Sequence, residues 1–260
     1  MYKFKRFGKD YSLLKPKAVS LFYSGLNCNQ IAEELEIYRK TVGKWLREAG
    51  CEYSKVNKAK INSSVFNDID TEEKAYWLGF IYADGYVSTT SNFELSLSLK
   101  DLDHLLKCKK FFQFEGKIYT DSKLNRCRLQ FQDSEIVNDL KKIGCVNKKS
   151  LVLTFPKLDD NFIPHFIRGY FDGDGSVSKP EKSISVSIVG TKQFLEPIHD
   201  LLNIPKYKIK HRQVKHAKEV HISEFSGKDA RNFGKFIYKD STVYLERKKE
   251  RFMKHLNKNL

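Results

Sequence analysis

The sequence of 260 residues contains few cysteines, and none of them forms a recognisable pair. Its five cysteines are odd in number and include no Cys-x-x-Cys motif. Structural zinc sites and disulfide frameworks usually need paired cysteines, so we expect neither, and a reducing compartment is favoured.

Long apolar segments are also missing. No apolar run approaches the roughly 20 residues that cross a membrane. The N-terminal stretch Met1-Tyr-Lys-Phe-Lys-Arg6 lacks the apolar core of a signal peptide. These absences predict an intracellular protein without a membrane partner, located in the cytoplasm, with the nucleoid or in an organelle.

Positive charge is what the chain has in excess. It has 47 Lys and Arg against 32 Asp and Glu, which gives a net charge of +15. Such a balance favours polyanionic partners, with nucleic acid as the first candidate. A generally basic soluble surface is the alternative. The hydrophobic content of 40% is ample for one large domain or two to three small ones.

Two short stretches, residues 77–85 and 167–175, share one pattern. Each is an apolar helical run that has two small residues four positions apart and ends in Asp-Gly. Without bulky side chains along one stripe, two such helices can pack backbone against backbone. The small residues are Gly79, Ala83, Gly169 and Gly173.

The two Asp-Gly endings would then meet. Asp84 and Asp174 would lie side by side at the helix ends, each followed by a glycine suited to a helix C-cap. Two carboxylates at such a short distance repel each other, so a divalent cation is expected between them. The pattern therefore predicts a metal-dependent nuclease centre.

The chain from residue 72 onward repeats one order of elements. We predict α+β halves of the form αββαββα at 71–155 and 156–260, related by a pseudo-two-fold axis. Strands are expected at 92–100, 126–132, 183–188, 206–213 and 219–225, with helices at 102–112, 134–143, 191–202 and 228–238.

The predicted strands alternate, so each sheet should keep one polar face open. A solvated sheet face is one interpretation, but the donors on it favour a nucleic-acid groove. The expected DNA-binding residues are Glu94, Ser96, Ser98, Lys100, Arg126, Arg128, Gln130, Gln132, Ser183, Ser185, Ser187, Lys192, Lys208, Lys210 and Arg212.

These features resemble the LAGLIDADG homing endonucleases of the monomeric, two-motif type, over about residues 72–253. Residues 149–156 and 244–248 also resemble segments of this family's sequences. The resemblance implies saddle-shaped antiparallel sheets in the DNA major groove and a double-strand break with short 3′ overhangs at a long site, as in intron homing. It also implies Mg²⁺, for which Mn²⁺ could substitute, at Asp84 and Asp174 with the adjoining Ala83 and Gly173.

A basic residue usually assists catalysis in this family, near the start of the last helix of each half. Lys228 stands at that place in the second half, whereas the first half has Ser134 there. Lys100 or Lys192 could supply the charge instead. Two residues before the metal-binding acid, the second motif keeps an acid, Asp172, which we interpret as helix-end structure or support for the site, whereas the first motif has Tyr82.

Residues 1–51 resemble a helix-turn-helix DNA-binding module, which a basic linker at 52–70 would join to the nuclease halves. Glu36 and Gly43 depart from the usual pattern, and a small helical accessory domain is the alternative. The exposed start of its recognition helix would carry the base and phosphate contacts. These residues are Tyr38, Arg39, Lys40, Thr41 and Lys44.

Two other functions share parts of this architecture. A transcription regulator could combine a decayed LAGLIDADG fold with a helix-turn-helix, although such regulators typically lose the catalytic acids. An intron RNA maturase would use the same fold to bind structured RNA. Because Asp84 and Asp174 are both present, a monomeric nuclease acting on double-stranded DNA is the leading hypothesis.

Overall fold

The computed structural model describes residues 11–51, 59–147, 149, 152–179, 181, 183–212 and 220–257. The chain divides into two compact units, Met1–Lys58 and Ala59–Leu260. Each has a hydrophobic core of its own.

The first unit consists of three short helices, α1 (Tyr11–Tyr23), α2 (Cys28–Glu34) and α3 (Arg39–Glu48). Asn27 caps α2, because its side chain accepts hydrogen bonds from two backbone amides while the Gln30 side chain reaches back to the Asn27 amide. The core formed by the three helices includes Ala18, Ile31, Leu35, Val42, Trp45 and Leu46.

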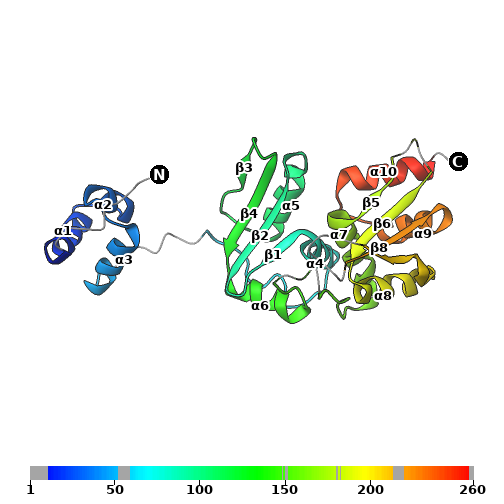
Figure 1. Ribbon diagram of the computed structural model, residues 1–260, viewed down its shortest axis with the longest axis horizontal. Helices are drawn as coiled ribbons and strands as arrows, with labels where there is room; N and C mark the ends of the chain where they lie inside the picture. Colours follow the sequence, from blue (N-terminus) through cyan, green and yellow to red (C-terminus); the bar gives the residue numbers. More distant parts are fainter. Residues whose placement is uncertain are drawn as a thin grey trace. The chain divides into compact units, whose positions relative to one another are not determined.

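The second unit contains two halves with the same order of elements (Figure 1). In the first half, helix α4 leads into a four-stranded antiparallel sheet of order β1-β2-β4-β3. The elements are α4 (Glu72–Asp84), β1 (Gly85–Val87), β2 (Asn92–Ser98), η1 (Leu99–Asp101), α5 (Leu102–Phe111), β3 (Tyr119–Asp121), β4 (Arg126–Gln132) and α6 (Ser134–Ile143).

The second half repeats this arrangement with the sheet order β5-β6-β8-β7 and adds a C-terminal helix. The predicted α+β class and its duplicated αββαββα halves are therefore confirmed. The elements are η3 (Asp160–Phe162), α7 (Ile163–Asp174), β5 (Ser176–Val177), β6 (Ser185–Gly190), α8 (Lys192–Leu202), η4 (Lys206–Lys208), β7 (Ile209–His211), β8 (His221–Ser226), α9 (Gly227–Tyr238) and α10 (Glu246–Asn257).

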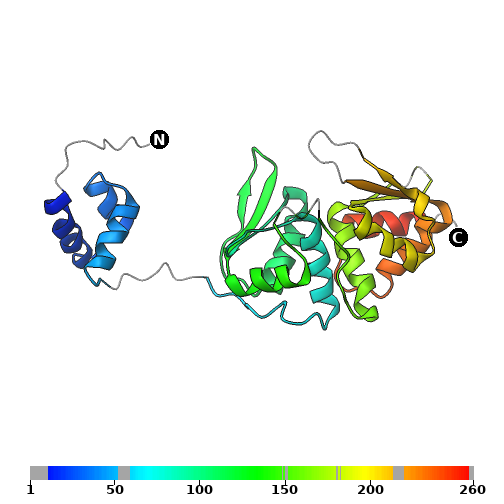
Figure 2. The same ribbon diagram turned by 60° about the horizontal axis from the view of Figure 1, so that its bottom comes forward.

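Helices α4 and α7 lie side by side between the two sheets (Figures 1 and 2). A Cβ atom on Gly79 would lie 2.0 Å from the carbonyl oxygen of Phe166, and one on Gly173 would lie 2.4 Å from the Cβ of Ala83. Only small residues permit such proximity, so the predicted backbone-to-backbone packing is present.

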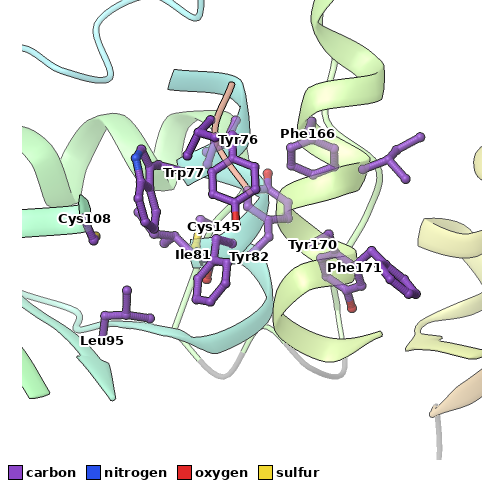
Figure 3. Packing of buried hydrophobic residues seen from close by; sticks show 14 of the residues in the cluster. Tyr76, Trp77, Ile81, Tyr82, Leu95, Cys108, Cys145, Phe166, Tyr170 and Phe171 are labelled. Carbon is purple, nitrogen blue, oxygen red and sulfur yellow. Dashed lines mark hydrogen bonds between the residues drawn. The ribbon is translucent and has the colours of Figure 1, made fainter. Parts of the chain in front are cut away.

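Aromatic side chains fill the space around these helices (Figure 3). Trp77 and Ile81 point from α4 toward Leu95 and Cys108 of the first half, while Phe171 points from α7 into the second half. The two halves thus share one continuous core, and this core fixes the ends of α4 and α7 relative to each other.

Some predicted boundaries differ from the structure. The strand expected at 183–188 spans Ser185–Gly190, and the predicted linker is shorter than 52–70. Residues 52–58 lie outside the described ranges. Residues 59–70 instead belong to the second unit, and Val65 and Phe66 are buried in its core. The polar composition of this segment hid the two apolar anchors.

Within the part of the chain that the structure describes, no helix is long and apolar enough to cross a membrane. The five cysteines are all buried, and none forms a disulfide.

Candidate functional site

Asp84 and Asp174 are the last residues of α4 and α7. A Cβ atom on Gly173 would lie 3.2 Å from the Oδ2 atom of Asp84, so this carboxylate lies against the backbone of the neighbouring helix. The glycine that follows each acid is the C-cap residue of its helix, as predicted, and its amide donates to the carbonyl oxygen four residues before it. Gly85 and Gly175 have extended backbones, with φ of −73° and −82°.

These glycines are required by space. A Cβ on Gly85 would lie 2.7 Å from the carbonyl oxygen of Ile81, and one on Gly175 would lie 2.6 Å from that of Phe171. The first strand of each sheet therefore leaves its helix at once, without a left-handed turn.

The environment of the two carboxyls opposes their charge. Burial, and then the charge of Asp174, raise the pKa of Asp84 to about 6. Burial likewise raises the pKa of Asp174. Both side chains are nevertheless exposed to solvent, so a ligand can reach them, while the protein packed around them disfavours two negative charges.

Two lysines that the sequence analysis did not select hold the backbone at this site. Lys248, on the first turn of α10, donates hydrogen bonds from Nζ to the carbonyl oxygens of Phe171 (2.6 Å), Gly173 (3.1 Å) and Gly175 (2.6 Å). These carbonyls form the C-terminal end of α7, where a cation is favourable. Burial lowers the pKa of Lys248 to about 8.

Lys149 occupies the corresponding place in the first half. Its Nζ donates to the carbonyl oxygen of Gly85, directly after Asp84. The charges of both lysines act on both carboxylates and favour their ionised forms, and Arg247 adds to this effect at Asp84. Arg247 is itself held by a bidentate ion pair with Asp101.

The lysine predicted to assist catalysis lies at the start of the helix where it was expected. Lys228 is exposed at the start of α9, and it is not among the cations whose charges are found to act on Asp84 or Asp174. Ser134 begins α6 as expected. Lys100 lies in η1, and Lys192 begins α8, where it pairs with Glu196.

The residues present fit a hard divalent cation. Among the described residues, no group of three or more His, Cys, Asp or Glu side chains could hold a metal, so the two aspartates would be its protein carboxylates. Mg²⁺ commonly binds one or two carboxylates and keeps waters or phosphate oxygens as its other ligands. The carbonyl of Gly173, included in the predicted set, already accepts a hydrogen bond from Lys248.

The open face of the first sheet carries the predicted polar side chains. In β2 and β4 the buried residues alternate with exposed or half-buried ones, and Ser96 and Ser98 lie opposite Arg128 and Arg126. Arg128 also forms an ion pair with Glu94 at 3.5 Å. The outward residues on these strands are Asn92, Glu94, Ser96, Ser98, Arg126, Arg128, Gln130 and Gln132.

The second sheet has a less charged open face. A hollow of about 340 Å³ is lined by five serines, together with Val186, Glu224 and Phe225. Ser185 and Ser187 belong to it, whereas Ser183 precedes the strand. Lys208, which pairs with Asp229, lies in η4 just before β7. Lys210 lies on β7, and Arg212 follows that strand.

In the first unit, α3 begins at Arg39 with Tyr38 as its N-cap residue. Tyr38, Arg39, Lys40 and Lys44 are exposed, and Thr41 is half-buried. The positive side chains thus lie opposite the buried Val42, Trp45 and Leu46.

Comparison with protein families agrees with this architecture. Residues 73–153 match the family described as WhiA LAGLIDADG-like domain. Residues 161–238 match the family described as LAGLIDADG-like domain. Each match covers less than a third of the chain. The two matched ranges coincide with the two halves, which contain α4 and α7.

Solved LAGLIDADG structures are similar to this chain at low sequence identity. The homing endonuclease I-GzeII in complex with its DNA target has a TM-score of 0.50 and 13% identity, over 75% of this chain and 88% of that one. DNA-bound I-LtrWI has a TM-score of 0.49 and 15% identity, over 76% and 91% of the two chains.

One curated relative also aligns with the chain. The replication factor C small subunit of Methanocaldococcus jannaschii is 28% identical over 148 residues. This alignment covers 53% of the present chain and only 8% of the length of that protein.

Proposed function

We propose that this protein is a site-specific DNA endonuclease that makes a divalent-metal-dependent double-strand break with short 3′ overhangs at a long recognition site. The observation that carries the proposal is the placement of Asp84 and Asp174 at the touching ends of α4 and α7, between two sheets with polar open faces. The net charge of +15 supports double-stranded DNA as the substrate.

The chain's own residues would divide the work between binding and charge control. Asp84 and Asp174 would hold Mg²⁺ or Mn²⁺, which when bound supplies an activated water and neutralises developing charge at the phosphate. Lys149 and Lys248 fix the carbonyls beside the two acids. Their ammonium groups also favour the ionised carboxylates and would attract the DNA phosphates.

The two sheets would read unequal half-sites. On the first sheet, Arg126 and Arg128 offer planar guanidinium donors suited to the acceptors of guanine in the major groove. On the second, serine hydroxyls offer short contacts that accept or donate. We therefore propose stricter base discrimination at the half-site bound by the first sheet.

The first unit would add a third contact with DNA. Its exposed Arg39, Lys40 and Lys44 at the start of α3 support a helix-turn-helix role for the unit. A tethered module of this kind would lengthen the recognised site and raise the effective concentration of the nuclease on it. We propose that the protein acts as a monomer in intron homing, because a single chain holds both acids.

A DNA-binding regulator is the second candidate. The match of residues 73–153 to a WhiA LAGLIDADG-like domain favours it, as does the N-terminal module. The presence of both Asp84 and Asp174, in a site that disfavours two negative charges without a cation, supports the nuclease instead.

The deciding experiment incubates the protein with a randomised duplex library and Mg²⁺ and sequences the cut ends. Wild type should cut one family of sites, whereas Asp84→Asn and Asp174→Asn should bind those sites and cut at least about 100-fold more slowly. Asp103→Asn, at an exposed acid on α5, is the matched control and should cut normally. Specific binding without cutting by wild type would favour the regulator.

A further inference from the structure

Asp172 is buried on α7, two residues before Asp174, and it is 1% exposed. It accepts three hydrogen bonds in the described structure. Its Oδ1 accepts from the Tyr238 hydroxyl at 2.7 Å, and its Oδ2 accepts from the Tyr76 hydroxyl at 2.9 Å and the Leu245 backbone amide at 2.7 Å. Buried carboxylates normally accept hydrogen bonds in this way. The third donor, the Leu245 amide, lies in the segment directly before α10.

Leu245 directly precedes α10 and begins its first turn. Its carbonyl oxygen accepts the backbone N–H groups of Lys248 (3.0 Å) and Lys249 (3.2 Å). The bond from the Leu245 amide to Asp172 therefore anchors the beginning of α10 to the last turn of α7. Lys248 projects from this anchored turn to the carbonyls of Phe171, Gly173 and Gly175.

The first motif has a tyrosine at the equivalent position, and that tyrosine contacts the equivalent segment. Tyr82 is two residues before Asp84, and its hydroxyl donates to the carbonyl oxygen of Ile143 at 2.6 Å. Ile143 ends α6, and the chain then leads to Lys149. Tyr82 thus connects α4 to the segment that carries Lys149, and Asp172 connects α7 to the segment that carries Lys248.

We propose that Asp172 is a positioning residue for Lys248, and that Tyr82 has the same role for Lys149. Each motif helix would then carry, two positions apart, a carboxylate for the site and a tether for the lysine beside it. The consequence for cutting rests on the proposed nuclease function, whereas the positioning itself does not.

Amine labelling tests the positioning without any cleavage. Metal-free protein is treated briefly with acetic anhydride, and acetylation is measured for each lysine by peptide mass spectrometry, with exposed Lys254 on α10 as the internal reference. Lys248 should be protected in wild type. In Asp172→Ala its acetylation should rise at least tenfold while that of Lys149 is unchanged, and Tyr82→Phe should affect Lys149 alone.

Two further variants separate positioning from a general loss of stability. Tyr238→Phe removes one buried bond to Asp172 but leaves the Leu245 anchor, so Lys248 should stay protected within about twofold. Asp172→Asn keeps one oxygen acceptor and should give intermediate acetylation of Lys248. If Asp172→Ala does not fold, an increase of at least threefold in Lys248 acetylation in Asp172→Asn would support the proposal. Continued protection of Lys248 in the Asp172 variants, or joint exposure of Lys149 and Lys248, would overturn the proposal.

Strand-resolved cutting provides the second readout. On a duplex labelled on both strands, Asp172→Ala should slow at least tenfold the same strand that Lys248→Met slows, and leave the other strand near its wild-type rate. Equal slowing of both strands would contradict positioning. If wild type cuts no DNA at all, the nuclease proposal fails while the labelling result still decides the role of Asp172.

Discussion

A Cβ atom added to Gly169 would lie 1.9 Å from the carbonyl oxygen of Tyr76 on the facing helix. Backbone cannot yield as a flexible side chain can, so Gly169→Ala must push α4 and α7 apart. We expect a loss of about 3 kcal/mol in the free energy of unfolding, at the upper end of the usual cost of overpacking, measured by denaturant titration. Gly234→Ala is the helical control, because its Cβ would meet the Phe252 ring, and its cost should be smaller.

The separation of α4 and α7 has a functional readout as well. Gly169→Ala should weaken Mg²⁺ binding if the protein folds, because Asp84 and Asp174 are held together by this helix contact. An unchanged stability and Mg²⁺ affinity would show that the helix contact is not what holds the two carboxylates together.

Stability should depend on pH through Asp84. Its folded pKa of about 6 lies above the ordinary value of 3.8, so the folded state binds this proton more tightly than the unfolded chain does. The associated stability is present below about pH 4 and lost as the pH rises through about 6. In metal-free protein at pH 7.5, Asp84→Asn should therefore be more stable by about 1 kcal/mol, after a discount for solvent screening.

Thermal denaturation with EDTA and with Mg²⁺ at pH 4.5 and 7.5 measures this effect. Mg²⁺ should stabilise wild type at pH 7.5, do so less at pH 4.5 and have little effect on Asp84→Asn, because the ion competes with the proton for the carboxylate. Asp103→Asn serves as the control. If Asp84→Asn proves less stable than wild type in EDTA at pH 7.5, the carboxylate is not disfavoured there.

The sequence predicted what depends on local pattern. Gly79 and Gly169 indicated the close helix contact because small residues at helical spacing have few other uses, and the alternation around Leu95 and Leu129 indicated the sheet faces. Lys149 and Lys248 lie in the family-like segments 149–156 and 244–248, but nothing in the local sequence shows that they lie beside Asp84 and Asp174 in the fold. Their positions follow from long-range packing of the segments after α6 and α9.

Two further differences have the same origin. Gly85 and Gly175 are the expected helix C-caps, but their backbones are extended, and the structure requires glycine there because a Cβ would clash with the preceding helical turn. Phe66 is 1% exposed although its segment reads as a polar linker, since one or two apolar anchors carry no periodicity. Composition averages over a segment, whereas burial depends on single side chains.

The turn between α2 and α3 carries strain that a substitution should relieve. Glu36 has φ of 51°, and it follows α2 in a Schellman arrangement in which the Ile37 amide donates to the Ala32 carbonyl and the Glu36 amide to the Glu33 carbonyl. Glycine suits this conformation, so Glu36→Gly should stabilise the first unit by roughly 0.5–1 kcal/mol. Glu36→Ala removes the side chain without relieving the strain and is the matched control.

Circular dichroism melting of residues 1–58 measures both variants, since this segment forms a compact unit of its own. We expect the order of stability to be Gly, then wild type and Ala together. If Ala stabilises as much as Gly, the effect comes from removing the Glu36 side chain and not from its backbone conformation.

Removal of the first unit tests how the protein divides its DNA contacts. The first 60 residues hold 13 Lys and Arg against 6 Asp and Glu, so nearly half of the net positive charge lies there. Deleting residues 1–58 should weaken binding to a long duplex and reduce the slope of log K against log salt, because fewer phosphate counterions are released. The cut positions should not move, since Asp84 and Asp174 remain.

Arg39→Ala with Lys40→Ala in the full chain should reproduce part of the loss of DNA affinity if α3 makes the contacts. Cutting at shifted positions would mean that the first unit sets the register of the nuclease on DNA and does not act as a tethered extension.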